Sequence, residues 1–130
     1  METKEGGFTI VELLVTIVIT GLIVVTVTTL FITIERTQHS TQLLETATRA
    51  GEQQIEALRN NNYNSLTTGS TITFTNTLPA NLPAPRSGTV AVSEPMAGVK
   101  RVDVTVTYRD GTKTKNVKLS SLIGQLGIGQ

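Results

Sequence analysis

The sequence predicts an α+β protein, in which a long N-terminal helix packs on a small antiparallel sheet of three or four strands. Three observations lead to this fold class. Residues 8–34 form an apolar run of 27 residues with a single charge. Apolar residues then recur at helical spacing as far as residue 58, and beyond residue 63 they alternate with polar ones, as in strands. The helix is therefore expected to have a membrane half and an amphipathic half.

The apolar run from Phe8 to Ile34 is long enough to cross a membrane, because about 20 apolar residues span the ~30 Å hydrocarbon core. It is about twice the length of the apolar core of a secretory signal, and no small-residue cleavage site follows it. Its only charged residue is Glu12. An ionised carboxylate in a membrane helix costs on the order of 2–3 kcal/mol, which makes Glu12 a functional candidate in need of a partner. We therefore expect residues 8–34 to be a transmembrane helix.

Residues 35–62 are expected to continue this helix into water as an amphipathic segment. An apolar stripe recurs there at spacings of three and four residues, at Leu44, Ala47, Gly51, Ile55 and Leu58. The asparagines at 60–62 are expected to end the helix. The stripe is the natural cover for the apolar face of the sheet that follows.

Residues 63–130 are expected to form a small antiparallel β head domain. Alternating patterns predict strands at 71–75, 90–92 and 102–108, and Asp110-Gly111 predicts a hairpin turn into a return strand at 114–119. The proline-containing stretch 76–88 is expected to be a loop. The glycine-interrupted tail 120–130 is expected to be mobile.

Charge is unevenly distributed, although the net charge is only +1. One Lys against three Glu leaves −2 on residues 1–34, three Arg against four Glu leave −1 on 35–63, and seven basic against three acidic groups leave +4 on 64–130. The absence of cysteine excludes disulfides and thiolate metal sites. The one histidine, His39, is expected at the surface, and no metal, cofactor or nucleophile motif is present. The sequence therefore does not indicate an enzyme.

The stretch Gly7-Phe8-Thr9-Ile10-Val11-Glu12, followed by the apolar run, resembles the processing site of type IV prepilins and type II secretion pseudopilins. The resemblance implies a leader peptide at residues 1–7, cleavage between Gly7 and Phe8 by a prepilin peptidase, and N-methylation of Phe8. It implies that Glu12 acts in filament assembly, where it attracts the N-terminal amine of a neighbouring subunit. The small head without a disulfide-closed loop is more like that of a minor pilin or minor pseudopilin.

The resemblance also implies partners and a location. The partners are the prepilin peptidase, other pilin or pseudopilin subunits, an inner-membrane assembly platform and membrane lipid. The protein would span the cytoplasmic membrane once, with its N-terminus cytoplasmic and its head outside, before entering a pilus or pseudopilus.

Two other functions stay open. The basic sheet could bind DNA or another polyanion during uptake, with Tyr108 as the one strand aromatic able to stack on a base. Nucleic acid is the less favoured partner, because the sequence has few aromatic residues. Alternatively, the chain could be an unprocessed single-pass anchor that carries a β domain.

Overall fold

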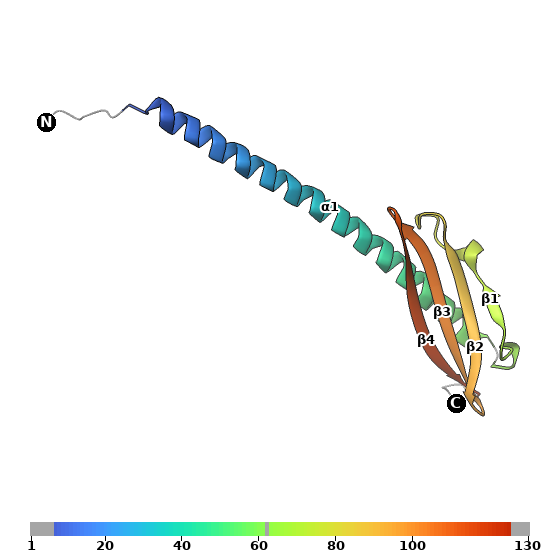
Figure 1. The fold of residues 1–130 in the computed structure, drawn as a ribbon. Coiled ribbons are helices and arrows are strands. Elements are labelled where there is room, and N and C mark those ends of the chain that lie inside the picture. The colour runs from blue at the N-terminus through green and yellow to red at the C-terminus, as the bar shows by residue number, and fades with distance from the viewer. Residues whose placement is uncertain (1–6, 62, 126–130) are drawn as a thin grey trace. The chain divides into compact units, whose positions relative to one another are not determined.

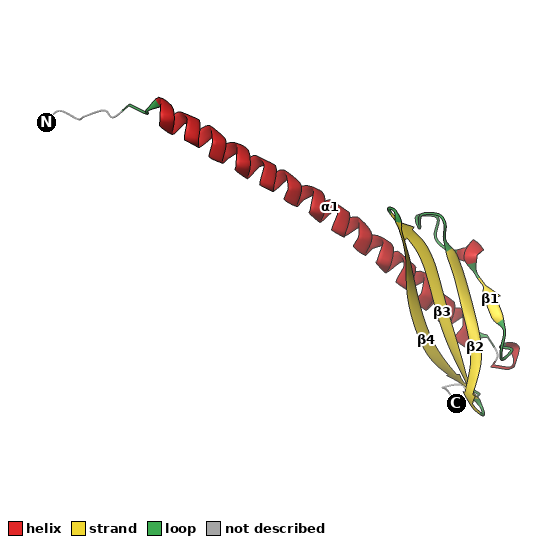
Figure 2. Cartoon of the chain, in the orientation of Figure 1, coloured by secondary structure: helices red, strands yellow, loops and turns green. Residues whose placement is uncertain are grey.

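The computed structural model describes residues 7–61 and 63–125. It contains one long helix, α1 (Ile10–Asn60), two short 3-10 turns, η1 (Tyr63–Ser65) and η2 (Thr75–Thr77), and one antiparallel sheet (Figures 1 and 2). The sheet has the strand order β1-β2-β3-β4, with strands at Thr71–Thr73, Ser87–Met96, Val99–Asp110 and Lys113–Gly124. The predicted α+β class is therefore confirmed. The chain divides into two compact units, residues 1–39 and 40–130.

The first unit consists, in its described part, of three non-helical residues and the N-terminal portion of α1. Every residue from Gly7 to His39 is exposed. Among the described residues α1 is the one helix that is long and apolar enough to cross a membrane. Threonine hydroxyls along it donate at 2.7–2.9 Å to the carbonyl four residues earlier, at Thr16, Thr26, Thr28, Thr29 and Thr33. In a membrane these bonds would satisfy hydroxyls that lipid cannot pair with.

In the second unit, one face of α1 packs on the sheet. The predicted stripe is right at Ala47, Gly51 and Leu58, which are buried, and Ile55 packs against the core while partly exposed. It is wrong at Leu44, which is 48% exposed. The neighbouring Leu43 is buried in its place, together with Ala50.

The reason for the error at Leu44 is the angular position of the buried face. At about 100° per residue, Leu43 and Leu44 lie on opposite sides of Ala47, about 40° and 60° from it. Both therefore satisfy a helical spacing. Leu44 lies toward the side of the partly exposed Ile55, at the margin of the packed face, so only the position of the sheet selects Leu43.

The sheet presents an apolar inner face to α1 and a polar outer face. Along β3 the buried residues alternate, at Lys100, Val102, Val104, Val106 and Tyr108. The register places Val90 of β2 opposite Val104, and Leu119 of β4 lies opposite it on the other side. The close approach to the helix is at Gly51, where a Cβ atom would lie 2.6 Å from Leu119 Cδ1. A small helix residue therefore sets the distance between helix and sheet here.

Several strand ends differ from the sequence prediction. β2 runs from Ser87 to Met96, longer than the predicted 90–92, and it includes the last two residues of the expected loop 76–88. β3 runs from Val99 to Asp110, longer than the predicted 102–108.

The first strand ends at Thr73, because the Phe74 carbonyl is engaged in a turn, accepting bonds from the Thr77 amide at 3.1 Å and hydroxyl at 2.8 Å. The last strand continues through Ser120 to Gly124, so the expected mobile tail is wrong for these residues. Ile123 is buried opposite Lys100, and this contact holds the strand end on the sheet. Gln125 is also placed, with its amide donating to the Gly98 carbonyl at 2.9 Å, and the rest of the expected tail, 126–130, lies outside the described residues.

Both hairpins turn at glycines with a positive φ. Gly111 (φ +61°) lies in the β3–β4 turn, which confirms the hairpin predicted at Asp110-Gly111. Gly98 (φ +79°) lies in the β2–β3 turn, which the sequence analysis did not anticipate. Side-chain-bearing residues seldom adopt these φ values, which explains glycine at both turns.

We expect Gly88→Ala to destabilise the second unit by about 1–3 kcal/mol, the usual cost of overpacking a core. A Cβ atom at this buried position would lie 2.6–2.8 Å from three atoms of the Phe74 ring, which is itself only 7% exposed. The ring therefore has little room to move. Thr114→Ala is the control, since Thr114 is an exposed strand residue of the same unit. Urea unfolding would measure both, and equal stability of the two variants would contradict the prediction.

Candidate processing and assembly site

The predicted cleavage site lies in exposed, non-helical chain. Gly7, Phe8 and Thr9 precede the first helical residue, Ile10, and all three are exposed. A Cβ atom at Gly7 would have no neighbour within 4 Å, and the Phe8 side chain is 79% exposed. An enzyme could therefore reach the peptide bond between Gly7 and Phe8 from solvent or from the membrane surface.

Thr9 is the N-cap of α1. Its hydroxyl oxygen accepts a hydrogen bond from the Glu12 amide at 3.2 Å, and its carbonyl accepts one from the Leu13 amide at 3.1 Å. The helical ladder of carbonyls therefore starts at Thr9, two residues beyond Gly7. Threonine is a favoured N-cap because its side chain satisfies an amide that has no partner within the helix.

Glu12 lies in the first turn of α1, at the third helical position, and is exposed. Both backbone groups of Glu12 form hydrogen bonds with threonine side chains. Its amide donates to the Thr9 hydroxyl oxygen, and its carbonyl accepts from the Thr16 hydroxyl at 2.7 Å. Among residues 7–61 and 63–125 its carboxylate forms no ion pair. The positive end of the helix dipole favours a negative charge in the first turn, but only modestly. The carboxylate is therefore available to an external cation.

The capping role of Thr9 was missed by the sequence analysis, although a signal was present. Thr9-Ile10-Val11-Glu12 has the pattern Ser/Thr-x-x-Glu of a capping box, which marks a helix start. The pattern lies inside the stretch that resembles a processing site. The same residues therefore have a local structural role in addition to any recognition by an enzyme.

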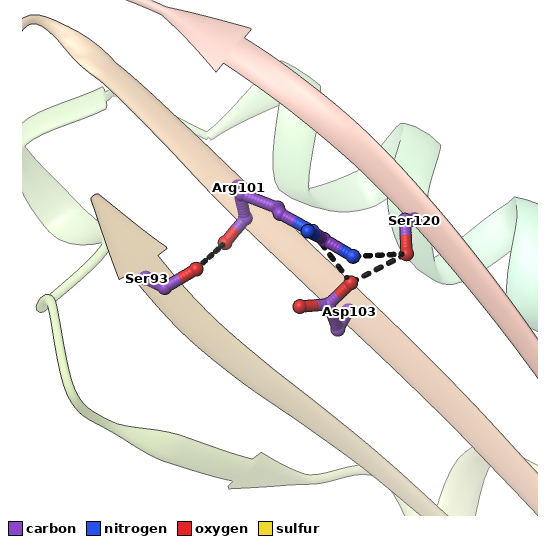
Figure 3. Close-up of polar contacts among 4 residues, drawn as sticks. All are labelled: Ser93, Arg101, Asp103 and Ser120. Carbon is purple, nitrogen blue, oxygen red and sulfur yellow. Dashed lines mark hydrogen bonds and ion pairs between the residues drawn. The ribbon is translucent and has the colours of Figure 1, made fainter. Parts of the chain in front are cut away.

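The outer face of the sheet carries a polar cluster that neutralises an arginine (Figure 3). Arg101 Nε and Asp103 Oδ1 are 3.0 Å apart, and the Ser120 hydroxyl also donates to Asp103. The Ser93 hydroxyl donates to the Arg101 carbonyl at 3.5 Å. The bond from Ser120, aided by Arg101, lowers the pKa of Asp103. The cluster joins strands β2, β3 and β4 through polar side chains on the outer face of the sheet.

Lys100 is the buried basic residue of the sheet, at 8% exposure. Its ammonium group donates to the carbonyls of Leu66 and of Tyr63, the latter at 2.9 Å, and lies 4.1 Å from the centre of the Tyr63 ring. Lys100 thereby connects the turn after α1 to strand β3. Lys100 is in step with the alternation Val102, Val104, Val106, so extending that pattern by one step would have placed it on the inner face of β3.

The Tyr63 hydroxyl lies 3.3 Å from the Glu94 carboxylate. Burial and this carboxylate both raise the pKa of Tyr63.

The structure corrects the view of Tyr108 as an exposed stacking residue. Tyr108 is fully buried, and its hydroxyl has no hydrogen-bond partner in the described part of the chain.

The positive charge of the head domain is partly compensated by carboxylates. Lys115 pairs with Asp110 at 2.6 Å, and that bond raises the pKa of Lys115. His39 is exposed, as expected. The described residues hold no cluster of three or more His, Cys, Asp or Glu side chains that could bind a metal ion.

Residues 3–28 match the family model for the prokaryotic N-terminal methylation motif. The chain therefore carries the N-terminal methylation motif of type IV prepilin-like proteins. Together with the long apolar helix, this motif fits a prepilin-like subunit anchored in the inner membrane by a single span. No curated protein and no solved structure matches the chain significantly.

Proposed function

We propose that this protein is a structural subunit of a type IV pilus or a type II secretion pseudopilus. A prepilin peptidase cleaves it between Gly7 and Phe8 and methylates the new amine of Phe8. The mature chain is held in the cytoplasmic membrane by residues 8–34 until it is assembled. The observation that carries the proposal is Glu12, the one charge in a 27-residue apolar run, five residues beyond Gly7.

The partner of Glu12 in this proposal is the amine of Phe8 in a neighbouring subunit. Removal of the leader creates a positive charge at the start of an apolar helix, where it needs a counter-charge. A carboxylate and an amine attract each other far more strongly in a low-dielectric filament core than in water. The exposure of Glu12 and the absence of an ion pair for it in the described chain support this role.

The proposal also assigns a role to each other segment of the chain. Residues 1–7 are the leader, 35–62 continue the helix, and 63–130 form the head. The N-terminus lies in the cytoplasm and the head outside, and the partners are other subunits, the assembly platform and lipid. The buried face of α1 in the second unit supports the assignment of the sheet as a head carried by this helix.

The two alternatives differ in their support. Nucleic-acid binding is less supported, because Tyr108, the residue expected to stack on a base, is buried. Three of the basic side chains are also engaged within the head. Lys100 donates to backbone carbonyls, and Arg101 and Lys115 pair with carboxylates. The plain anchor leaves Glu12 without a reason to be in the apolar run.

Processing is tested by the mass of the mature protein. In a host with a prepilin peptidase, the membrane-extracted chain should begin at N-methylated Phe8. Gly7→Val should block cleavage, because proteins with this motif carry a very small residue before the cut and a β-branched side chain would crowd the scissile bond in the peptidase. Gly21→Val, at a glycine inside α1, is the control and should be cut normally. A wild-type chain that still begins at Met1 would refute the proposed processing and favour the plain anchor.

A further inference from the structure

We propose that Thr9 is a positioning residue for leader cleavage: its cap fixes the start of α1 and so keeps the scissile Gly7–Phe8 bond out of the helix. This inference rests on the proposed processing. Two observations carry it, namely the bond from the Glu12 amide to the Thr9 hydroxyl and the non-helical, exposed state of Gly7 and Phe8.

The alternative helix start shows why the cap matters. Glycine is about as good an N-cap as threonine. If Thr9 could not cap, Gly7 would be the next suitable residue toward the N-terminus. An N-cap residue contributes its own carbonyl to the first bond of the helix, as Thr9 does to the Leu13 amide at 3.1 Å. A helix capped at Gly7 would therefore take up the scissile carbonyl, which would accept a bond from the Val11 amide.

The membrane surroundings favour such an extension over fraying. An apolar medium penalises each backbone group that lacks a hydrogen bond, so a helix that loses its cap gains by forming further turns. A scissile carbonyl already bonded within a helix is less available to a peptidase that must polarise it and add water across the peptide bond. Only the chains with a non-helical Gly7 would then be cleavable.

The substitution Thr9→Val tests this directly, since valine matches threonine in shape and lacks the hydroxyl. We expect the KM of the full-length chain for a purified prepilin peptidase in detergent micelles to rise about threefold to tenfold, with kcat unchanged, because a smaller fraction of substrate is competent to bind. Thr9→Ser and Thr9→Asn, which can both cap, should restore the wild-type KM. Thr16→Val is the matched control, because the Thr16 hydroxyl bonds to the carbonyl of Glu12 and not to its amide.

Hydrogen exchange supplies a readout that does not depend on the enzyme. In the Thr9→Val chain the Val11 amide should exchange more slowly than in the wild type, because it gains the Gly7 carbonyl as a partner. Slow cleavage with unchanged exchange at Val11 would mean that the peptidase contacts Thr9 directly, and it would overturn the positioning role.

The remaining outcomes separate this inference from the function on which it rests. A Thr9→Val chain cut with wild-type KM, or a Thr9→Ser chain as poor as Thr9→Val, would refute the capping role and leave the proposed processing intact. A wild-type chain that the peptidase does not cut would refute both.

Discussion

Glu12→Ala is expected to insert into the membrane and to lose its leader normally, but to enter filaments at least about tenfold less than the wild type. Removing a charge makes the span more apolar, so insertion should be no harder. Cleavage should also be unaffected, because the scissile bond lies five residues from Glu12. The Thr9 hydroxyl that caps α1 bonds to the backbone amide of residue 12, which alanine keeps. Assembly, in contrast, would bury the amine of Phe8 without a counter-charge, at a cost of several kcal/mol per subunit.

Glu12→Gln separates charge from shape in the same experiment. Glutamine keeps the size of the side chain and a hydrogen-bonding group but removes the attraction to an amine, so it should be nearly as defective as alanine. Glu45→Ala is the matched control, since Glu45 is an exposed carboxylate of the same helix that pairs with Arg49 at 2.6 Å, four residues away. The measurement is the amount of subunit in sheared filaments relative to the membrane pool. Normal incorporation of both Glu12 variants would show that Glu12 has no assembly role.

Leu58→Ala is expected to destabilise the head by about 2–5 kcal/mol, the range for deleting a large buried aliphatic side chain. Leu58 is 4% exposed and belongs to the core between α1 and the sheet. Leu44→Ala, on the same helix, is the matched control and should change stability by less than about 0.5 kcal/mol, because Leu44 is 48% exposed. Ile55→Ala should lie between them, since Ile55 is partly buried.

These values can be measured by equilibrium urea unfolding of a chain that begins at Glu35, which we expect to be soluble and monomeric. If Leu58→Ala and Leu44→Ala cost the same, the helix face that packs on the sheet has been assigned wrongly. The Leu44 control also bears on assembly, because an exposed leucine beside the packed face is free to contact another subunit.

Sequence patterns predicted the structure correctly where a feature depends on residues that are close together in the sequence. The 27-residue apolar run, the asparagine run at whose first residue α1 ends and the glycine of the β3–β4 turn each act through a few neighbouring residues. Thr9-x-x-Glu12 belongs to the same class of signal, and its capping role could have been read from the sequence. The alternation Val102, Val104, Val106 likewise identified the inner face of β3, because side chains of a strand point to opposite faces in turn.

The sequence by itself determined the α+β class, the single candidate membrane span and the charge at Glu12, since each depends only on the order of residues along the chain. Only the tertiary structure decided which leucine of the pair 43–44 is buried, because both have helical spacing and the sheet packs against one. It also decided that Tyr108 is enclosed and that Lys100 lies buried against two carbonyls. The alternation in β3 places Tyr108 and Lys100 in step with Val102, Val104 and Val106, but the groups that enclose these two side chains come from segments distant in sequence. The choice between residues 43 and 44 depends on where the sheet packs, and helical spacing alone does not contain that information.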